Sequence, residues 1–175
     1  TAEFIPGSAP GVAGHLIRAG RDPDYRWAVD EVTVDAFADT WDKIDSWEDT
    51  RDFDLMYLLW LLKLGAGSES SGATVGNNMT TLSPKLLQAI EQRLVDNRYR
   101  YNDPNPDGRL DNLWYWSENH IVIGRVIEFL AGQHLSEQTF TVTGLTGAEH
   151  MERSKPEILQ WISERARFGF FEWHS

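Results

Sequence analysis

Apolar residues recur every three or four positions along much of the chain, as they do on the buried side of an amphipathic helix. The first such series consists of Val34, Phe37, Trp41 and Ile44. It predicts a helix from about residue 25 to residue 48. A second helix is predicted over residues 53–64, where apolar side chains occur on nearly all sides, and Gly65 suits its C-terminal cap. Because it has almost no polar side, this second helix should lie at the centre of the core.

Capping residues mark the start of two further helices. Ser83 followed by Pro84 is a typical N-cap and first-turn pair, and it predicts a third helix. Ser117 is the expected N-cap of a fourth helix, which should reach about residue 131 and end at Gly132.

The fifth helix is predicted from a capping box, in which the side chains of Thr146 and Glu149 each bind the other residue's backbone N–H. It should reach Phe168 and end at Gly169. Pro156 lies within this range and removes one helical hydrogen bond, so the helix either kinks there or restarts after a break.

Helical stretches joined by loops, with no alternation of strands and helices, indicate an all-α fold built from antiparallel helical hairpins. About five helices are expected. Residues 1–21 contain several prolines and glycines and are predicted to be an irregular lead-in. Residues 22–175 then form a single helical-hairpin domain, which is an ordinary size for one domain.

The charge of the chain narrows the classes of protein to which it can belong. Among 175 residues, 27 are acidic and 16 are basic, and the formal net charge of −11 argues against nucleic-acid binding. Most of the excess lies between residues 22 and 54 and is best explained as the solvated face of the first helix. The absence of cysteine excludes a disulfide framework, a thiolate zinc site and a cysteine nucleophile. No apolar run approaches the ~20 residues needed to span a membrane.

The start of the fourth predicted helix carries the most informative group of polar residues. With Ser117 as N-cap, its first turn contains Glu118, Asn119 and His120. Unpaired N–H groups and the helix dipole favour an anion at such a position. The preceding aromatic residues, on which a sugar ring could stack, are Trp114, Tyr115 and Trp116. The motif predicts a substrate site with His120 and Glu118 in acid–base chemistry; the alternative is that these residues only cap the helix.

A second candidate group lies at the C-terminus. Glu172 and His174 are two residues apart, so they would point to the same side of an extended segment, with Trp173 on the other side. Together with His120 they form a predicted acid–base set, because histidine titrates close to neutral pH. His150, in the first turn of the fifth helix, is expected to face the same cavity. The alternative is an aromatic cluster that packs on the core.

One loop matches the beginning of an EF-hand calcium loop. Its candidate ligands are Asp103, Asn105, Asp107 and Asp111. The twelfth position, which should be a bidentate glutamate, is Trp114, and two prolines interrupt the pattern. Two consecutive turns explain the segment equally well, so we expect no metal and no other cofactor.

Three segments resemble a group of large bacterial proteins that are expected to fold as α/α toroids. The segments are W-S-E-N-H at residues 116–120, T-G-A-x-H at residues 146–150 and G-F-x-E-W-H-S at residues 169–175. The resemblance covers most of the chain from about Tyr25 onward, and it implies a toroid. A closed toroid takes more helices than are expected here. The resemblance therefore implies an incomplete toroid, which is a fragment of a longer chain or is completed by a second fragment.

More remotely, the segment 118–120 is similar to the N-N-H segment of α/α-toroid polysaccharide lyases, which cleave uronic-acid glycans by β-elimination. The resemblance implies that Asn119 and His120 hold the substrate carboxylate and assist removal of a proton. A tyrosine often acts as base or acid in these lyases, and Tyr115 is only a neighbour of the segment. Glu118 replaces the first asparagine, which matters because its carboxylate would repel a uronate unless it is protonated or paired.

The sequence leaves three functional hypotheses. The first is a glycan-active enzyme, lyase-like on acidic polysaccharide, with a hydrolase that uses Glu118 and Glu172 as its variant. The second is a non-catalytic helical module that binds a glycan or a protein, and the third is a scaffold segment. Under the first hypothesis, the residues that bind a polysaccharide or oligosaccharide are Asn119, Tyr115, Trp114, Trp116, Trp173 and His150. Glycan chemistry and a first residue other than methionine favour an exported or extracellular protein.

Overall fold

The computed structural model describes residues 9–22, 24, 34–65 and 82–172, and in these ranges the chain is helical with no β-strand. The elements are α1 (Ala9–Arg21), the 3₁₀ helix η2 (Val34–Phe37), α2 (Ala38–Asp45), α3 (Arg51–Gly65), α4 (Pro84–Asp96), α5 (Glu118–His134) and α6 (Gly147–Phe168). Within the same ranges, β pairing is limited to an isolated bridge between Thr139 and Thr146. No helix of the described part is long and apolar enough to cross a membrane. The prediction of an all-α fold is confirmed.

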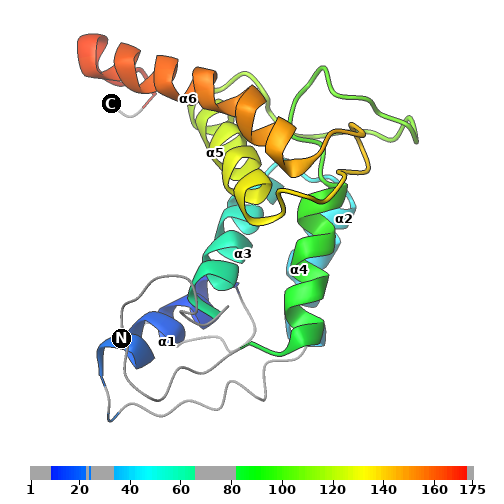
Figure 1. Ribbon diagram of the computed structural model, residues 1–175, viewed down its shortest axis with the longest axis vertical. Coiled ribbons are helices and arrows are strands. Elements are labelled where there is room, and N and C mark those ends of the chain that lie inside the picture. Colours follow the sequence, from blue (N-terminus) through cyan, green and yellow to red (C-terminus); the bar gives the residue numbers. More distant parts are fainter. Residues whose placement is uncertain (1–8, 23, 25–33, 66–81, 173–175) are drawn as a thin grey trace.

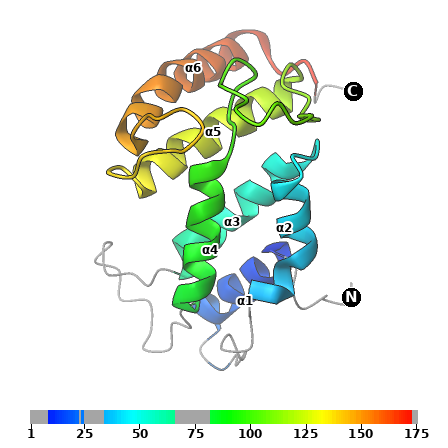
Figure 2. The ribbon, with the colours of Figure 1, turned by 90° about the vertical axis from the view of Figure 1, so that its right-hand side faces the viewer.

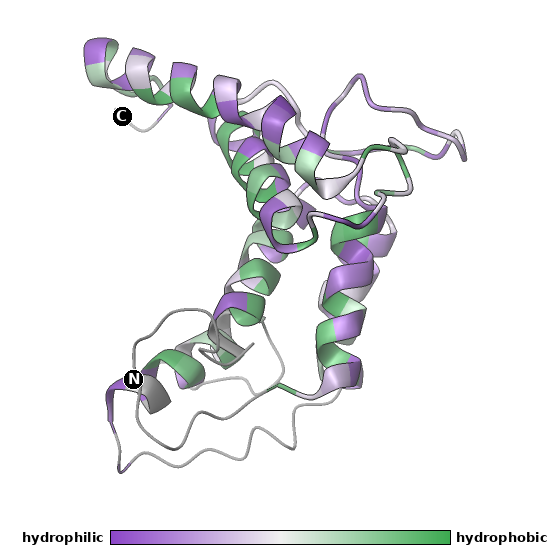
Figure 3. Cartoon of the chain, viewed as in Figure 1, coloured by the Kyte–Doolittle hydropathy of each residue, from purple (hydrophilic) through white to green (hydrophobic). Residues whose placement is uncertain are grey.

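Helix α3 lies at the centre of the described structure, as its sequence predicts. It packs against α1, α2, α4 and α5 (Figure 1, Figure 2). Figure 3 shows that α3 is mostly hydrophobic, whereas the loop between α4 and α5 is mostly hydrophilic. The almost completely buried leucines of α3 are Leu55, Leu58, Leu59, Leu61 and Leu62. Because these leucines face several directions, α3 is stable only with packing partners around it.

The prediction of an irregular lead-in over residues 1–21 is wrong for residues 9–21, which form α1. Helix α1 packs against α3 with one apolar side. The buried residues of this side are Ala9, Val12, Ala13 and Leu16. Their spacing is that of a buried helix face, and Pro10 occupies the N-terminal turn, where proline is tolerated. Residues 1–8 lie outside the described part.

The first predicted helix, over residues 25–48, is shorter than expected where the structure describes it. It starts with η2 and continues as α2, which ends at Asp45; residues 25–33 lie outside the described ranges. Trp47 then adopts a left-handed backbone conformation with a φ angle of 58°, which an α-helix cannot include. The predicted apolar stripe is nevertheless buried, at Phe37, Trp41 and Ile44.

The start of α4 is confirmed as predicted. The Ser83 hydroxyl accepts a hydrogen bond from the backbone N–H of Leu86 at 3.3 Å, and Pro84 is the first helical residue. Leu86, Ile90 and Leu94 follow at helical spacing and are fully buried. The sequence was sufficient to predict this helix because the capping residue and the buried residues all lie within one short segment.

Helix α6 begins with the predicted capping box between Thr146 and Glu149. Pro156 lies inside a continuous helix of 22 residues, so the predicted break does not occur. The helix ends at Gly169, whose φ of 77° lies in the left-handed region that favours glycine.

Gly132 does not end the preceding helix, in contrast to the prediction, because α5 continues to His134. The role of Gly132 is instead to allow close packing of α5 against α6. A Cβ atom at Gly132 would lie 2.3 Å from the carbonyl oxygen of Gly147, and one at Gly147 would lie 2.1 Å from the carbonyl oxygen of Leu135. The two helices lie side by side at one end of the molecule (Figure 1, Figure 2).

Candidate functional site

The C-terminal segment docks on the start of α5 through two carboxylates. Glu118 accepts hydrogen bonds from the backbone N–H groups of Phe171, at 3.0 Å, and Glu172, at 2.8 Å. Glu172 in turn accepts a hydrogen bond from the backbone N–H of Asn119 at 2.8 Å, in the first turn of α5. The structure therefore brings these two predicted catalytic carboxylates together, but both bind backbone N–H groups.

The charge of Glu118 is also compensated. Arg165, on α6, forms an ion pair with its carboxylate. The backbone N–H groups of Glu172 and Phe171, together with the Arg165 guanidinium, hold the pKa of Glu118 below its ordinary value. Desolvation raises this pKa, but by less than these groups lower it. A paired Glu118 is less repulsive to an anionic ligand than the free carboxylate that the sequence suggested.

Asn119 organises the turn around it. Its side-chain oxygen accepts hydrogen bonds from the Ser117 hydroxyl at 2.6 Å and from the backbone N–H of His120 at 2.7 Å. Ser117 is the N-cap residue, as predicted, but its hydroxyl accepts no bond from the helix. Glu172 supplies the capping carboxylate instead, which is a long-range version of the N-cap interaction.

His120 contacts a buried aspartate that the sequence did not single out. Its Nδ1 atom lies 2.7 Å from Oδ2 of Asp52, which is in the first turn of α3. The two side chains are 9 % and 3 % exposed, and the edge of the Phe53 ring packs near the imidazole with 5.5 Å between ring centroids. Burial raises the pKa of Asp52, and the hydrogen bond with His120 opposes that rise. The only hint in the sequence was an aspartate at the start of a predicted core helix. Because His120 lies 68 residues away, the sequence could not show that the two residues are partners.

Three exposed rings form a surface that we call the aromatic platform, made of Tyr101, Trp114 and Trp116. Their exposed fractions are 63 %, 56 % and 58 %. The ring of Trp116 contacts both others, with centroid distances of 5.9 Å to Trp114 and 5.2 Å to Tyr101. The sequence identified the two tryptophans, whereas Tyr101 precedes them by a loop and was missed.

Tyr115 lies next to the platform, in contact with Tyr101, and its hydroxyl belongs to a charged network. The hydroxyl donates to Asp111 at 2.6 Å and accepts from Arg51 at 2.9 Å. Burial raises the pKa of Tyr115 well above its ordinary value. Its hydroxyl therefore anchors the loop, while its ring edge contacts Tyr101.

His150 does not face the start of α5, which corrects the prediction that it lines the same cavity. It is completely buried, with Nδ1 at 2.9 Å from Glu128 and Nε2 at 2.7 Å from the Thr143 hydroxyl. Glu128 lies in the second half of α5, well after the first turn that contains residues 118–120. The two remaining predicted residues, Trp173 and His174, lie outside the described residues.

The candidate calcium ligands have separate partners. Asp103 pairs with Arg153, and Asp111 pairs with Arg51 and Arg98. The Asn105 side chain donates to the backbone carbonyl of Arg109, and Asp107 pairs with the Arg109 guanidinium. Among the described residues no group of three or more histidine or acidic side chains is placed to hold a metal ion. The arginines therefore provide the positive charge that these two buried aspartates require.

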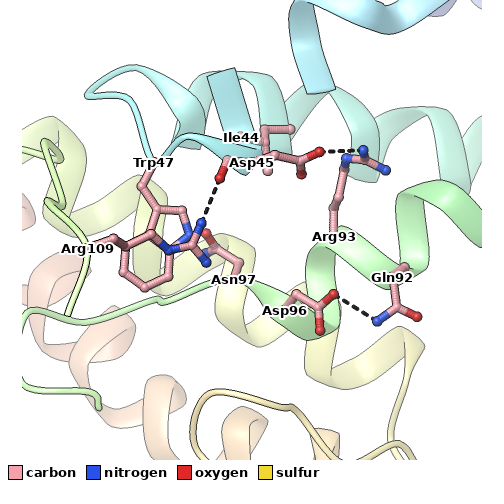
Figure 4. Close-up of a pocket in the computed structure, with 8 residues that line it drawn as sticks. All are labelled: Ile44, Asp45, Trp47, Gln92, Arg93, Asp96, Asn97 and Arg109. Carbon is pink, nitrogen blue, oxygen red and sulfur yellow. Dashed lines mark hydrogen bonds and ion pairs between the residues drawn. The ribbon is translucent and has the colours of Figure 1, made fainter. Parts of the chain in front are cut away.

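A surface pocket of about 360 Å³ lies between the end of α2, α4 and Arg109 (Figure 4). Its charged groups are largely satisfied by one another. The guanidinium of Arg93 pairs with Asp45 at 2.7 Å, and that of Arg109 lies over the Trp47 ring at 3.8 Å. The pocket includes none of the residues that the sequence identified as a site.

The described geometry thus offers two separate chemical features, an exposed aromatic platform and an imidazole paired with a buried carboxylate. Comparison of the chain with protein-family models, with curated proteins and with solved structures gave no match. Function is therefore inferred from these two features and from the residues around them.

Proposed function

We propose that this domain binds a polysaccharide on the aromatic platform. The observation that carries the proposal is that Tyr101, Trp114 and Trp116 are each more than half exposed while they contact one another. A contiguous patch of exposed apolar rings often marks a binding site, whereas single exposed apolar residues are common on any protein surface. Sugar rings offer flat C–H faces to aromatic rings, and the Tyr hydroxyl and Trp N–H groups can bind sugar hydroxyls at the edges.

The platform is held in place before any ligand arrives. The backbone N–H of Trp114 donates to Asp49 at 2.8 Å, and the Tyr115 hydroxyl is fixed by Asp111 and Arg51. A preformed surface loses little conformational entropy on binding, so more of the contact energy becomes affinity.

The exchange Trp114→Ala should weaken polysaccharide binding by about 30-fold, since loss of an aromatic anchor of the platform costs about 2 kcal/mol. Isothermal titration with soluble neutral and uronic-acid polysaccharides measures this change. The matched control is Trp60→Ala, because Trp60 is 48 % exposed on α3 but lies outside the platform. Equal affinities of the two variants for every polysaccharide bound by the unmodified protein would contradict the proposal, as would no binding to any of them.

A second candidate function is lyase-like β-elimination on an acidic polysaccharide, and the contact between His120 and Asp52 favours it. A histidine held by a carboxylate is a suitable proton acceptor near neutral pH. Asn119 and His120 would bind the substrate and assist proton removal. The pairing of Glu118 with Arg165 lessens its repulsion of a uronate. A hydrolase has less support, because Glu118 and Glu172 both bind backbone N–H groups.

The exchange His120→Ala should reduce elimination by about 10²- to 10⁴-fold, the usual contribution of a general acid or base. Ultraviolet absorbance of the unsaturated product follows the reaction on a panel of uronic-acid polysaccharides. His134→Ala is the control, because His134 lies at the other end of α5 and pairs with Glu91 at 3.0 Å. An unmodified protein that is inactive on the whole panel would remove this candidate and leave the binding function.

In this proposal the helices are antiparallel hairpins of an incomplete α/α toroid, and the chain acts together with the remainder of a longer protein or with a second fragment. The exposed apolar residues of α6 agree with such a partner. They include Leu159, Ile162 and Phe168. Analytical ultracentrifugation of a mixture of this chain with a candidate second fragment would test their association.

A further inference from the structure

We infer that Asp52 is the positioning residue of His120, which it holds with the proton on Nδ1 and with Nε2 directed at the substrate. The inference rests on the lyase-like function proposed above and adds the residue that prepares its base. Asp52 acts through the imidazole and does not touch the substrate itself.

The two oxygens of Asp52 have different partners. Oδ1 accepts a hydrogen bond from the backbone N–H of Phe53 at 2.9 Å, and Oδ2 lies 2.7 Å from Nδ1 of His120. An ionised carboxylate only accepts hydrogen bonds, so the proton between these two groups belongs to Nδ1. The neutral imidazole then carries its lone pair on Nε2.

The imidazole is fixed from several sides. Its residue lies in the first turn of α5 and Asp52 lies in the first turn of α3, two helices that pack against each other. The edge of the Phe53 ring covers part of the imidazole. No described residue binds Nε2, and Nε2 is not among the buried polar atoms that lack a partner, so it is the ring nitrogen accessible to a ligand.

The arrangement can carry out the proton transfer of an elimination. Nε2 takes the proton from the carbon next to the substrate carboxylate, and the electron pair of that C–H bond forms the new carbon–carbon double bond. The bond from the neighbouring carbon to the glycosidic oxygen breaks, and its electron pair leaves with the oxygen. The imidazolium returns the proton to that oxygen, so no external oxidant or reductant is needed. The Asp52 carboxylate stabilises the imidazolium while it exists.

His150 makes a similar contact between its Nδ1 atom and a buried carboxylate, but in a purely structural role. Nδ1 of His150 lies 2.9 Å from Glu128, but its Nε2 is occupied by the Thr143 hydroxyl at 2.7 Å and its side chain is fully buried. His120 has the same contact at Nδ1 and keeps Nε2 available. His150 therefore serves as an internal reference in any measurement of the imidazole groups.

The test compares the imidazole nitrogen NMR spectrum of the unmodified chain with that of Asp52→Asn. In the unmodified chain, His120 should show the signature of a proton on Nδ1. In the variant, this signature should be lost or mixed with that of the other tautomer, while His150 stays unchanged. Elimination should fall by no more than the roughly 10²- to 10⁴-fold loss expected for His120→Ala, because the wrong tautomer disables the same base, with KM little changed. Asp54→Asn, on the same helix, is the control and should alter neither measurement.

A proton on Nε2 of His120 in the unmodified chain would overturn the inference, even if the variant does not fold. The inference would also fail if Asp52→Asn folded and kept both the tautomer and the rate. A proton on Nδ1 that depends on Asp52, in a chain without elimination activity, would support the positioning role and contradict the lyase-like function. The two proposals can therefore fail separately.

Discussion

The exchange Gly132→Ala should lower the free energy of unfolding by about 3 kcal/mol, because it forces an atom between two helix backbones. The added Cβ would lie 2.3 Å from the carbonyl oxygen of Gly147 and 3.0 Å from the backbone nitrogen of Met151. Both atoms belong to the first turns of α6 and cannot rotate away as a side chain could. The methyl group is accommodated only if α6 moves away from α5, which reduces the packing between them.

The control for this prediction is Gly124→Ala, at a second buried glycine of the same helix. A Cβ there would meet its nearest neighbour, the carbonyl oxygen of Tyr99, at 3.7 Å, an ordinary contact. Alanine is favoured over glycine within a helix by up to about 1 kcal/mol, so this variant should be as stable as the unmodified chain or more stable. Urea unfolding followed by circular dichroism measures both values. Equal destabilisation by the two exchanges would show that the close approach of α5 and α6 is not the cause.

Gly132 also shows why some helix boundaries could be predicted from the sequence and others could not. The caps at Ser83 and Thr146 depend on groups three residues apart, so the sequence contains the whole interaction. A glycine near the end of an apolar stretch has two explanations, a helix end or a close contact with another helix. Only the position of Gly147, on a different helix, distinguishes them. The restart that Pro156 suggested was likewise overridden, since α6 continues past it.

The sequence selected the residues of the candidate site, but it did not supply their contacts. The segment around His120 was selected because three polar residues in a predicted first helical turn follow directly on aromatic residues. Its partner Asp52 depends on how α3 packs on α5, and a separation of 68 residues leaves no local signal. Glu118 and Glu172 were selected as acids or bases, and the structure shows each binding backbone N–H groups of the other's segment. Carboxylate chemistry could be read from the sequence, but the partners of the carboxylates could not.

A buried group of charges under α6 supports a second large effect on stability. Glu128 is completely buried and accepts hydrogen bonds from Nε of Arg100, at 3.0 Å, and Nε of Arg153, at 2.7 Å. Nδ1 of His150 lies 2.9 Å from the same carboxylate. Glu128 therefore pairs with both arginines, while Asp103 is a second partner of Arg153 and Glu157 is a second partner of Arg100.

The exchange Glu128→Gln should lower the free energy of unfolding at neutral pH by about 3 kcal/mol, because it removes the buried carboxylate that Arg100 and Arg153 share and leaves each arginine with one counter-charge fewer. Burial alone would raise the pKa of Glu128, but the His150 hydrogen bond and the charges of Arg100 and Arg153 hold the pKa below its ordinary value of 4.5. A carboxylate whose pKa is lower in the folded state stabilises the fold above its unfolded pKa and loses that contribution as the pH falls through its folded pKa. The difference between the variant and the unmodified chain should therefore be constant near neutral pH and shrink below about pH 4.5.

Urea unfolding at a series of pH values, from pH 7 down to the lowest pH at which both proteins remain folded, measures this difference in the free energy of unfolding. Glu137→Gln is the control, because Glu137 is exposed and lies outside the buried group; it should change stability by less than about 0.5 kcal/mol at every pH. A loss for Glu128→Gln that is equally small, or that persists unchanged below the folded pKa of Glu128, would mean that the charge of Glu128 does not stabilise the fold. In that case Asp103, which pairs with Arg153, and Glu157, which pairs with Arg100, would satisfy the two arginines without Glu128.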